Sequence, residues 1–147
     1  MRGIGFTVSN GENILRTIFT GVACEKYWWN ITEEEIYDKM DKPLFAENYI
    51  NGKTFVDTIS NQNHHVIFAN IKAYPPNTSP TELETYEDFI KSDCQLNLLC
   101  VDVIYYEIYS KDDFVIETIR SNASKNGFHN VEYITEENDG RTRFSVW

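Results

Sequence analysis

Gly52, Lys53 and Thr54 reproduce the end of a phosphate-binding loop, in which backbone amides and the lysine hold the phosphates of a nucleotide. That loop needs a further glycine five residues before Gly52, so that successive amides can surround the phosphate. Glu47 occupies that position, and no apolar strand leads into the segment. The three residues therefore predict the start of a helix rather than a nucleotide site.

The histidines do not have the spacing of a metal site. His64 and His65 are adjacent, so on a strand their rings point to opposite faces and do not readily bind one ion. His129 stands alone in the sequence. We therefore predict no metal site, and no motif implies another cofactor.

Three cysteines, Cys24, Cys94 and Cys100, lack the Cys-x-x-Cys spacing of redox and zinc motifs. No apolar leader precedes them, and their odd number argues against a disulfide framework, so we predict a reduced, cytoplasmic protein. Cys94 and Cys100 are an even number of residues apart and would share one face of a regular strand. Burial there would raise the pKa of each thiol, so we predict structural cysteines rather than nucleophiles.

Acidic side chains occur in runs, at residues 33–35, 112–113 and 136–137. Neighbours in a sequence seldom form the facing pair that acid and base chemistry needs, so most of these carboxylates should be solvated. No catalytic residue is predicted. A weaker alternative is a small hydrolase without a sequence motif, in which His65 or His129 meets distant carboxylates in space.

Aromatic residues and two arginines are the strongest sign of a binding surface. Tyr27, Trp28 and Trp29 are consecutive, and successive strand residues point to opposite faces, so at least one tryptophan could line a groove. Arg141 and Arg143 would share a face of the last strand, either paired with a neighbouring glutamate or forming a fork for a carboxylate or phosphate. The predicted ligand-binding residues are Tyr27, Trp28, Trp29, Tyr74, Arg141 and Arg143.

Hydrophobic periodicity indicates the strands that must position these residues. Strand-like runs occupy residues 1–8, 27–36, 65–74, 94–109, 130–135 and 141–147. The second run is predicted to be a strand with one solvated end or an edge strand, and the third, apolar on both faces, lies at the centre of the predicted sheet. The fourth run is too long for one strand, so Asp102 marks a bulge or a turn. The last two runs predict a C-terminal hairpin around Asp139 and Gly140.

Capping residues place the helices between these strands. The predicted caps are Asn10, Asn51, Thr85 with Asp88, and Ser110 with Asp113. Gly127 fits the residue after the end of the last helix, and three prolines within residues 75–80 predict an exposed loop. We therefore predict one α+β domain over residues 1–147, with a single mixed, mostly antiparallel sheet of about five to seven strands and two to four helices packed on it.

The charge of the chain restricts its partners. Its 147 residues include 23 acidic and 13 basic side chains, for a formal net charge of -10. This charge repels duplex nucleic acid and anionic membranes, and no apolar run approaches the roughly 20 residues that span a bilayer. We therefore predict neither duplex nucleic acid nor membrane as a partner. A basic protein fits the charge, and an edge strand could pair with a second copy in a homo-oligomer.

Four stretches together point to a family. They are residues 1–6 (Met-Arg-Gly-Ile-Gly-Phe), 86–96 (Tyr-Glu-Asp-Phe-Ile-Lys-Ser-Asp-Cys-Gln-Leu), 107–112 (Glu-Ile-Tyr-Ser-Lys-Asp) and 131–142 (Val-Glu-Tyr-Ile-Thr-Glu-Glu-Asn-Asp-Gly-Arg-Thr). The chain resembles, from end to end, a family of small proteins from spore-forming Gram-positive bacteria and their phages, domain-of-unknown-function family 2691. The resemblance implies a bacterial or phage setting and supplies no reaction and no site residues.

Because every nucleophile, metal and phosphate motif fails its test, we predict a non-enzymatic binding protein. In the first interpretation, it sequesters a small planar, nucleotide-derived ligand in an aromatic-lined pocket, by analogy with small proteins that hold signalling nucleotides. In the second, an acidic face around residues 33–35 blocks a basic protein, as an immunity protein or inhibitor does. The aromatic residues fit both interpretations, and the net charge favours the second.

Overall fold

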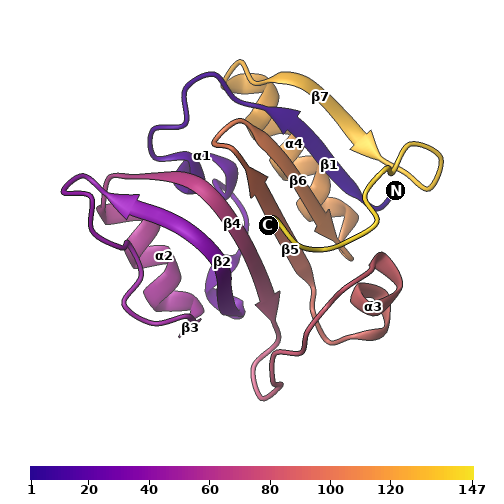
Figure 1. Cartoon of the computed structure of the whole chain (residues 1–147), viewed down its shortest axis with the longest axis horizontal. Coiled ribbons are helices and arrows are strands. Elements are labelled where there is room, and N and C mark those ends of the chain that lie inside the picture. Colours follow the sequence, from indigo (N-terminus) through magenta and orange to yellow (C-terminus); the bar gives the residue numbers. More distant parts are fainter.

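Seven strands form one antiparallel sheet in the computed structural model, which describes all 147 residues. In chain order they are β1 (Gly3–Thr7), β2 (Trp28–Asp38), β3 (Tyr49–Asn51), β4 (His64–Tyr74), β5 (Leu96–Val101), β6 (Tyr105–Ser110) and β7 (His129–Ile134). Their spatial order is β3-β2-β4-β5-β6-β1-β7, and every neighbouring pair is antiparallel (Figure 1).

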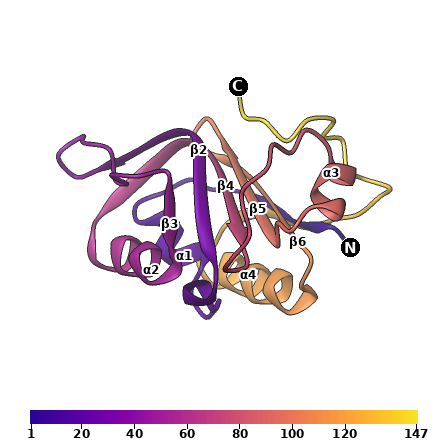
Figure 2. The ribbon, with the colours of Figure 1, turned by 90° about the horizontal axis from the view of Figure 1, so that it is seen from below.

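Helices cover the two faces of the sheet unequally. α1 (Ile14–Ile18), α2 (Gly52–Asn61) and α4 (Asp113–Lys125) lie on one face, termed the helical face (Figure 2). α3 (Tyr86–Lys91) lies on the second face, together with the C-terminal segment, and a 3-10 turn, η1 (Cys24–Lys26), precedes β2. This arrangement confirms the predicted α+β class. No helix is long and apolar enough to cross a membrane.

The main core fills the space between the helical face and its three helices. Strand alternation sends Ile4, Ile71 and Ile108 into this core. Trp29 is fully buried there, because its ring stacks on Phe55 of α2 with 4.0 Å between the ring centroids. The indole N–H also donates to the carbonyl of Cys24 in η1 at 3.0 Å, so one side chain connects β2, α2 and η1.

A smaller apolar cluster, termed the second cluster, covers part of the second face. Tyr109 of β6, Phe89 of α3 and Phe144 of the C-terminal segment pack in it, and the rings of Tyr109 and Phe144 lie 4.6 Å apart. The cluster holds α3 and the C-terminal segment against the sheet. The neighbouring part of β2 and β4 carries polar side chains instead.

Local capping predictions for three helices are confirmed. Asn51 Oδ1 accepts a hydrogen bond from the amide of Thr54 at 2.8 Å, at the start of α2. Thr85 and Asp88 make both hydrogen bonds of a capping box before α3. Gly127 follows α4 with a φ of 72°, a conformation that glycine adopts without a steric penalty.

The predicted C-terminal hairpin is wrong in its second half, because residues 141–147 form no strand and instead cross the second face. The Arg141 guanidinium donates to the carbonyls of Arg143 at 3.1 Å and of Ser145 at 3.0 Å. Phe144 inserts into the second cluster and is buried. These contacts satisfy carbonyl groups that a strand would have paired with β7.

β2, for which we predicted one solvated end or an edge position, lies one place inside the edge of the sheet. β3 pairs with the outer side of β2, so β3 and β7 are the edges of the sheet.

Cys94 and Cys100 do not share a face, because β5 begins after Cys94. Cys94 packs in the second cluster, whereas Cys100 faces the main core.

Two of the predicted caps are displaced. Asn10 Oδ1 accepts from the amide of Glu12 at 3.1 Å in a turn before α1, rather than capping that helix. Asp112, not Ser110, caps α4 by accepting from the amide of Phe114 at 2.9 Å.

Candidate functional site

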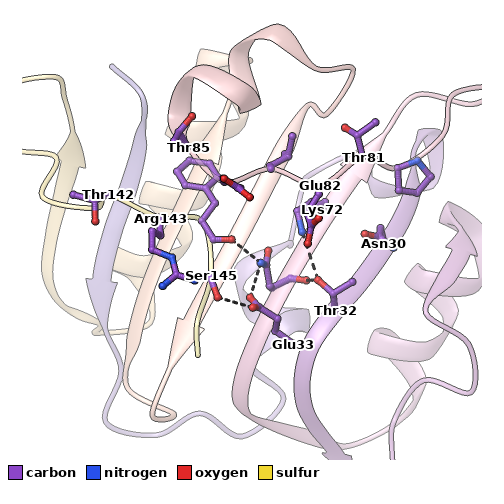
Figure 3. A pocket seen from close by; sticks show the side chains of 15 residues that line it. Asn30, Thr32, Glu33, Lys72, Thr81, Glu82, Thr85, Thr142, Arg143 and Ser145 are labelled. Atoms are coloured by element: carbon purple, nitrogen blue, oxygen red, sulfur yellow. Dashed lines mark hydrogen bonds between the residues drawn. The ribbon is translucent and has the colours of Figure 1, made fainter.

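A polar cavity lies on the second face, between β2, β4, the loop of residues 80–85 and residues 142–145 (Figure 3). Its volume is about 660 Å³, and only two of its 15 lining residues are hydrophobic. Ligand sites of proteins usually have volumes of about 300–1,000 Å³. The cavity is therefore large enough for a small organic molecule, and its walls suit a hydrophilic one.

Lys72 lies at the floor of the cavity. It is 5% exposed, and its amine lies 3.5 Å from Thr32 Oγ1 on the adjacent strand. No carboxylate lies within 4.0 Å of this amine. Burial lowers the pKa of Lys72, and the negative charge of Glu33 and Glu82 opposes this effect without cancelling it. Burying an amine without an ion pair costs folding free energy, and such costs are typically retained at functional sites, so Lys72 is the first residue to consider.

Glu33 anchors the opposite wall. It lies at a bulge of β2 with a φ of 43°, and its carboxylate accepts three hydrogen bonds. Asn70 Nδ2 donates at 2.8 Å, the amide of Val146 at 3.0 Å, and Ser145 Oγ at 2.5 Å. Burial raises the pKa of Glu33, but these hydrogen bonds outweigh burial and hold the pKa below its ordinary value. Glu33 is thus an ionised clamp on the C-terminal segment.

Two buried asparagines extend this network below the cavity. Asn97 Nδ2 of β5 donates to Asn70 Oδ1 at 2.8 Å, and Asn70 Nδ2 donates in turn to the carbonyl of Phe144 at 3.0 Å. Asn97 stands opposite Lys72 in the register of β4 and β5. The buried Asn97 Oδ1 has no hydrogen-bond partner, which leaves an acceptor beside the lysine.

The rim carries charges of both signs. Arg143 is exposed and forms no ion pair, whereas Glu82 and Glu84 are exposed on the loop that forms the far wall. Figure 3 shows the Glu82 and Lys72 side chains in the same part of the cavity, with Arg143 near the C-terminal wall. A ligand with an acidic group would meet a free guanidinium at this rim.

The predicted ligand-binding residues do not surround one pocket. Trp29 is in the main core, Tyr27 is half-buried on its margin, and Trp28 packs on Tyr49 with 5.2 Å between the ring centroids. These three rings line no part of the polar cavity. Trp29 has no exposed surface, so its assignment to the ligand site is wrong. That Tyr27 and Trp28 stack on a planar ligand stays a prediction.

The other three predicted residues lie around the cavity. Tyr74 is buried, but its hydroxyl donates to the carbonyl of Thr81 at 3.2 Å and so holds the cavity loop. Arg141 supports the C-terminal wall and bonds to Glu107 Oε1 at 2.8 Å. Arg143 alone of the six lines the cavity itself.

Sequence reasoning missed Lys72, Asn70 and Glu33. The signal was present in the run from residue 65 to residue 74, where Asn70 and Lys72 alternate with apolar residues and must face one side of the strand. Glu33 gave no such signal, because it lies in a run of three glutamates that resembles an exposed acidic face. In the structure Glu34 Oε2 is buried without a partner, so residues 33–35 are not a uniformly solvated patch.

The lysine of the loop-like motif, the histidines and the cysteines all lie outside the polar cavity. Lys53 pairs with Asp57 on α2, and His64 accepts from the amide of Leu15 at 3.2 Å. His65 on β4 and His129 on β7 are four strands apart. All three cysteines are buried, and burial raises the pKa of Cys24 to about 12 and that of Cys94 and Cys100 to about 11.

Fold and cavity define a small antiparallel α+β protein with a polar pocket on the sheet face that its main helices leave uncovered. The chain belongs to a family described as a protein of unknown function, DUF2691, whose model matches residues 1–145. It is 33% identical over 151 residues to the uncharacterized protein YncE of Bacillus subtilis (strain 168), covering 99% of each chain. No solved structure matches the chain.

Proposed function

We propose that the protein binds and sequesters a small acidic molecule in the polar cavity, without turnover. The observation that carries this proposal is that two cations, the buried Lys72 and the exposed Arg143, line one cavity of an acidic protein and neither forms a salt bridge. A buried amine without a counter-charge raises the free energy of a fold, and an acidic ligand would recover part of that energy.

The chemistry of the walls supports an acidic and hydrophilic ligand. Arg143 offers a planar fork for a carboxylate or a phosphate, and the hydroxyls of Thr32, Thr81 and Thr85 can donate or accept around it. A nucleotide-derived ligand belongs to this class through its phosphate. The buried free cysteines support our placing this binding in a reduced, cytoplasmic setting.

Isothermal titration calorimetry with glycerol 3-phosphate and with adenosine monophosphate tests the proposal. We expect binding to the native chain that is weakened by Arg143→Ala. Arg120→Ala is the matched control, because Arg120 lies on α4 on the opposite face, where it contacts Glu117 and the ring of Tyr133. The proposal is contradicted if neither probe binds the native chain, or if both variants lose the same affinity.

A second candidate is an inhibitor of a basic protein. The observation that favours it is a group of exposed carboxylates around α3, formed by Glu82, Glu84, Glu87 and Asp93. Opposite charges on a partner would speed its association with this surface. Native mass spectrometry of the protein from its host tests this: a heavier complex that disappears in the double variant Glu87→Lys and Asp93→Lys supports the inhibitor, and a bare chain opposes it.

A further inference from the structure

We propose that Lys72 captures its ligand covalently and reversibly, as an imine with the carbonyl group of an aldehyde or ketone that also carries an acidic group. This inference rests on the proposed function, because the acidic group is what the cavity binds first. It specifies that the acidic ligand is also a carbonyl compound and that Lys72 is the nucleophile that captures it.

Lys72 differs from every other lysine in its surroundings. It is the only buried lysine, whereas Lys53 is exposed and paired with Asp57 at 2.9 Å. Lys111 is half-buried, but its amine donates to the carbonyl of Ser92 at 2.6 Å. The amine of Lys72 has only the long contact with Thr32 Oγ1 and lines a cavity that opens to solvent. A small molecule in the cavity can therefore meet this amine.

The reaction needs a neutral amine, because an ammonium has no lone pair to donate. Burial lowers the pKa of Lys72, which increases the neutral fraction at physiological pH. Lysines that form Schiff bases in proteins are activated in this way, by removal from water rather than by a neighbouring acid. The absence of a carboxylate within 4.0 Å preserves that effect, since a close ion pair would stabilise the charged form.

The bond changes balance without an oxidant or a reductant. The lone pair of Lys72 Nζ attacks the carbonyl carbon, a C–N bond forms, and the π electrons of the C=O bond move to the oxygen. One amine proton passes from the nitrogen to that oxygen, which gives a carbinolamine with a hydroxyl group. The second amine proton passes to the hydroxyl, the C–O bond breaks with loss of water, and a C=N bond remains. Glu82 lines the same cavity and its negative charge acts on Lys72, so its carboxylate can relay each of these protons through a water molecule.

The same walls restrict the ligand further. Arg143 lies at the C-terminal side of the cavity and Lys72 at the floor of β4, so the acidic group and the carbonyl belong to different ends of the ligand (Figure 3). Lining residues are mainly polar, which suits hydroxyl groups between these two ends. Open-chain sugar phosphates and related phosphorylated aldehydes have this combination.

Reductive trapping tests the inference. The protein is incubated with glyceraldehyde 3-phosphate and sodium cyanoborohydride, which reduces an imine to a stable secondary amine, and the adduct is located by peptide mass spectrometry. We expect one adduct per chain at Lys72, in several-fold excess over Lys53, and its loss in Lys72→Arg. Glycerol 3-phosphate has the same phosphate but no carbonyl, so it should form no adduct and should slow the labelling of Lys72 by competition.

The outcomes separate this inference from the proposed function. If glycerol 3-phosphate binds in calorimetry but the aldehyde labels Lys72 no faster than Lys53, covalent capture is wrong and the binding protein stands. If neither compound binds and no adduct forms at Lys72, both are wrong. The competition experiment uses the native chain, so its result does not depend on how well the Lys72→Arg variant folds.

Discussion

Replacing Glu33 by glutamine should loosen the C-terminal wall of the cavity and lower the free energy of unfolding. Glu33 accepts hydrogen bonds from Asn70, Ser145 and the amide of Val146. A hydrogen bond to a charged group contributes about 1.5–3 kcal/mol, less where solvent screens it, and three bonds to one carboxylate are not additive. Glutamine keeps one carbonyl oxygen and can donate to Ser145, so we expect a loss of about 1–2 kcal/mol, and about 3 kcal/mol for Glu33→Ala.

The pH dependence of this loss follows from the lowered pKa of Glu33. A carboxylate whose pKa is lower in the folded state stabilises the fold at pH values above its pKa in the unfolded chain, here the ordinary pKa of 4.5. That contribution is lost as the pH falls through the folded value. The difference between the native chain and Glu33→Gln should therefore be full at pH 7 and should shrink progressively below pH 4.5.

Urea unfolding followed by tryptophan fluorescence measures both effects. Trp147 packs edge-on against Phe68 with 5.9 Å between the ring centroids, so its emission also reports release of the C-terminal segment. Glu35→Gln is the matched control, because Glu35 is the next but one residue and makes no ion pair. Equal stability of the two variants at pH 7 would refute the clamp.

Three further changes test other parts of the fold. Burial lowers the pKa of His64, so the native chain should lose stability as the pH falls below 6.5 and through the folded pKa of this histidine. His64→Asn should remove this part of the acid sensitivity, which urea titrations at several pH values measure. Trp29→Ala should lower the free energy of unfolding by about 3–5 kcal/mol in the same assay, through the cavity left against Phe55. Val103→Gly should raise the melting temperature, because Val103 has a φ of 69°, a strained value for a β-branched residue; a lower melting temperature would contradict this.

Sequence patterns predicted the elements where local physics decides the outcome. The cap at Asn51 and the capping box of Thr85 and Asp88 depend on residues three positions apart, and both form as expected. Residues 141–147 have the alternation of a strand, but the guanidinium of Arg141 bonds to Glu107 of β6 and the ring of Phe144 packs in the second cluster on the sheet. Such long-range contacts leave no periodic signal, so the hairpin prediction failed there.

The cavity could be predicted only in part. Arg143 was identified because positive charges are scarce in this acidic chain, whereas Lys72 was hidden by the apolar residues on either side of it. Whether Lys72 lines a cavity depends on which face of β4 the helices leave uncovered, and the sequence does not specify that face. The glutamate clamp depends on a contact across 112 positions, between Glu33 and Ser145, which no local pattern encodes.

The walls of the cavity come from four distant parts of the chain, around residues 30–33, 70–72, 80–85 and 142–145. A chain is synthesised from its N-terminus, so β2 and β4 can pair on the ribosome long before residues 142–145 exist. Until those residues emerge, Lys72 and Asn70 are exposed on an unfinished sheet. The cavity is therefore a property that only the completed fold acquires, and a nascent chain would lack the site that we propose for binding.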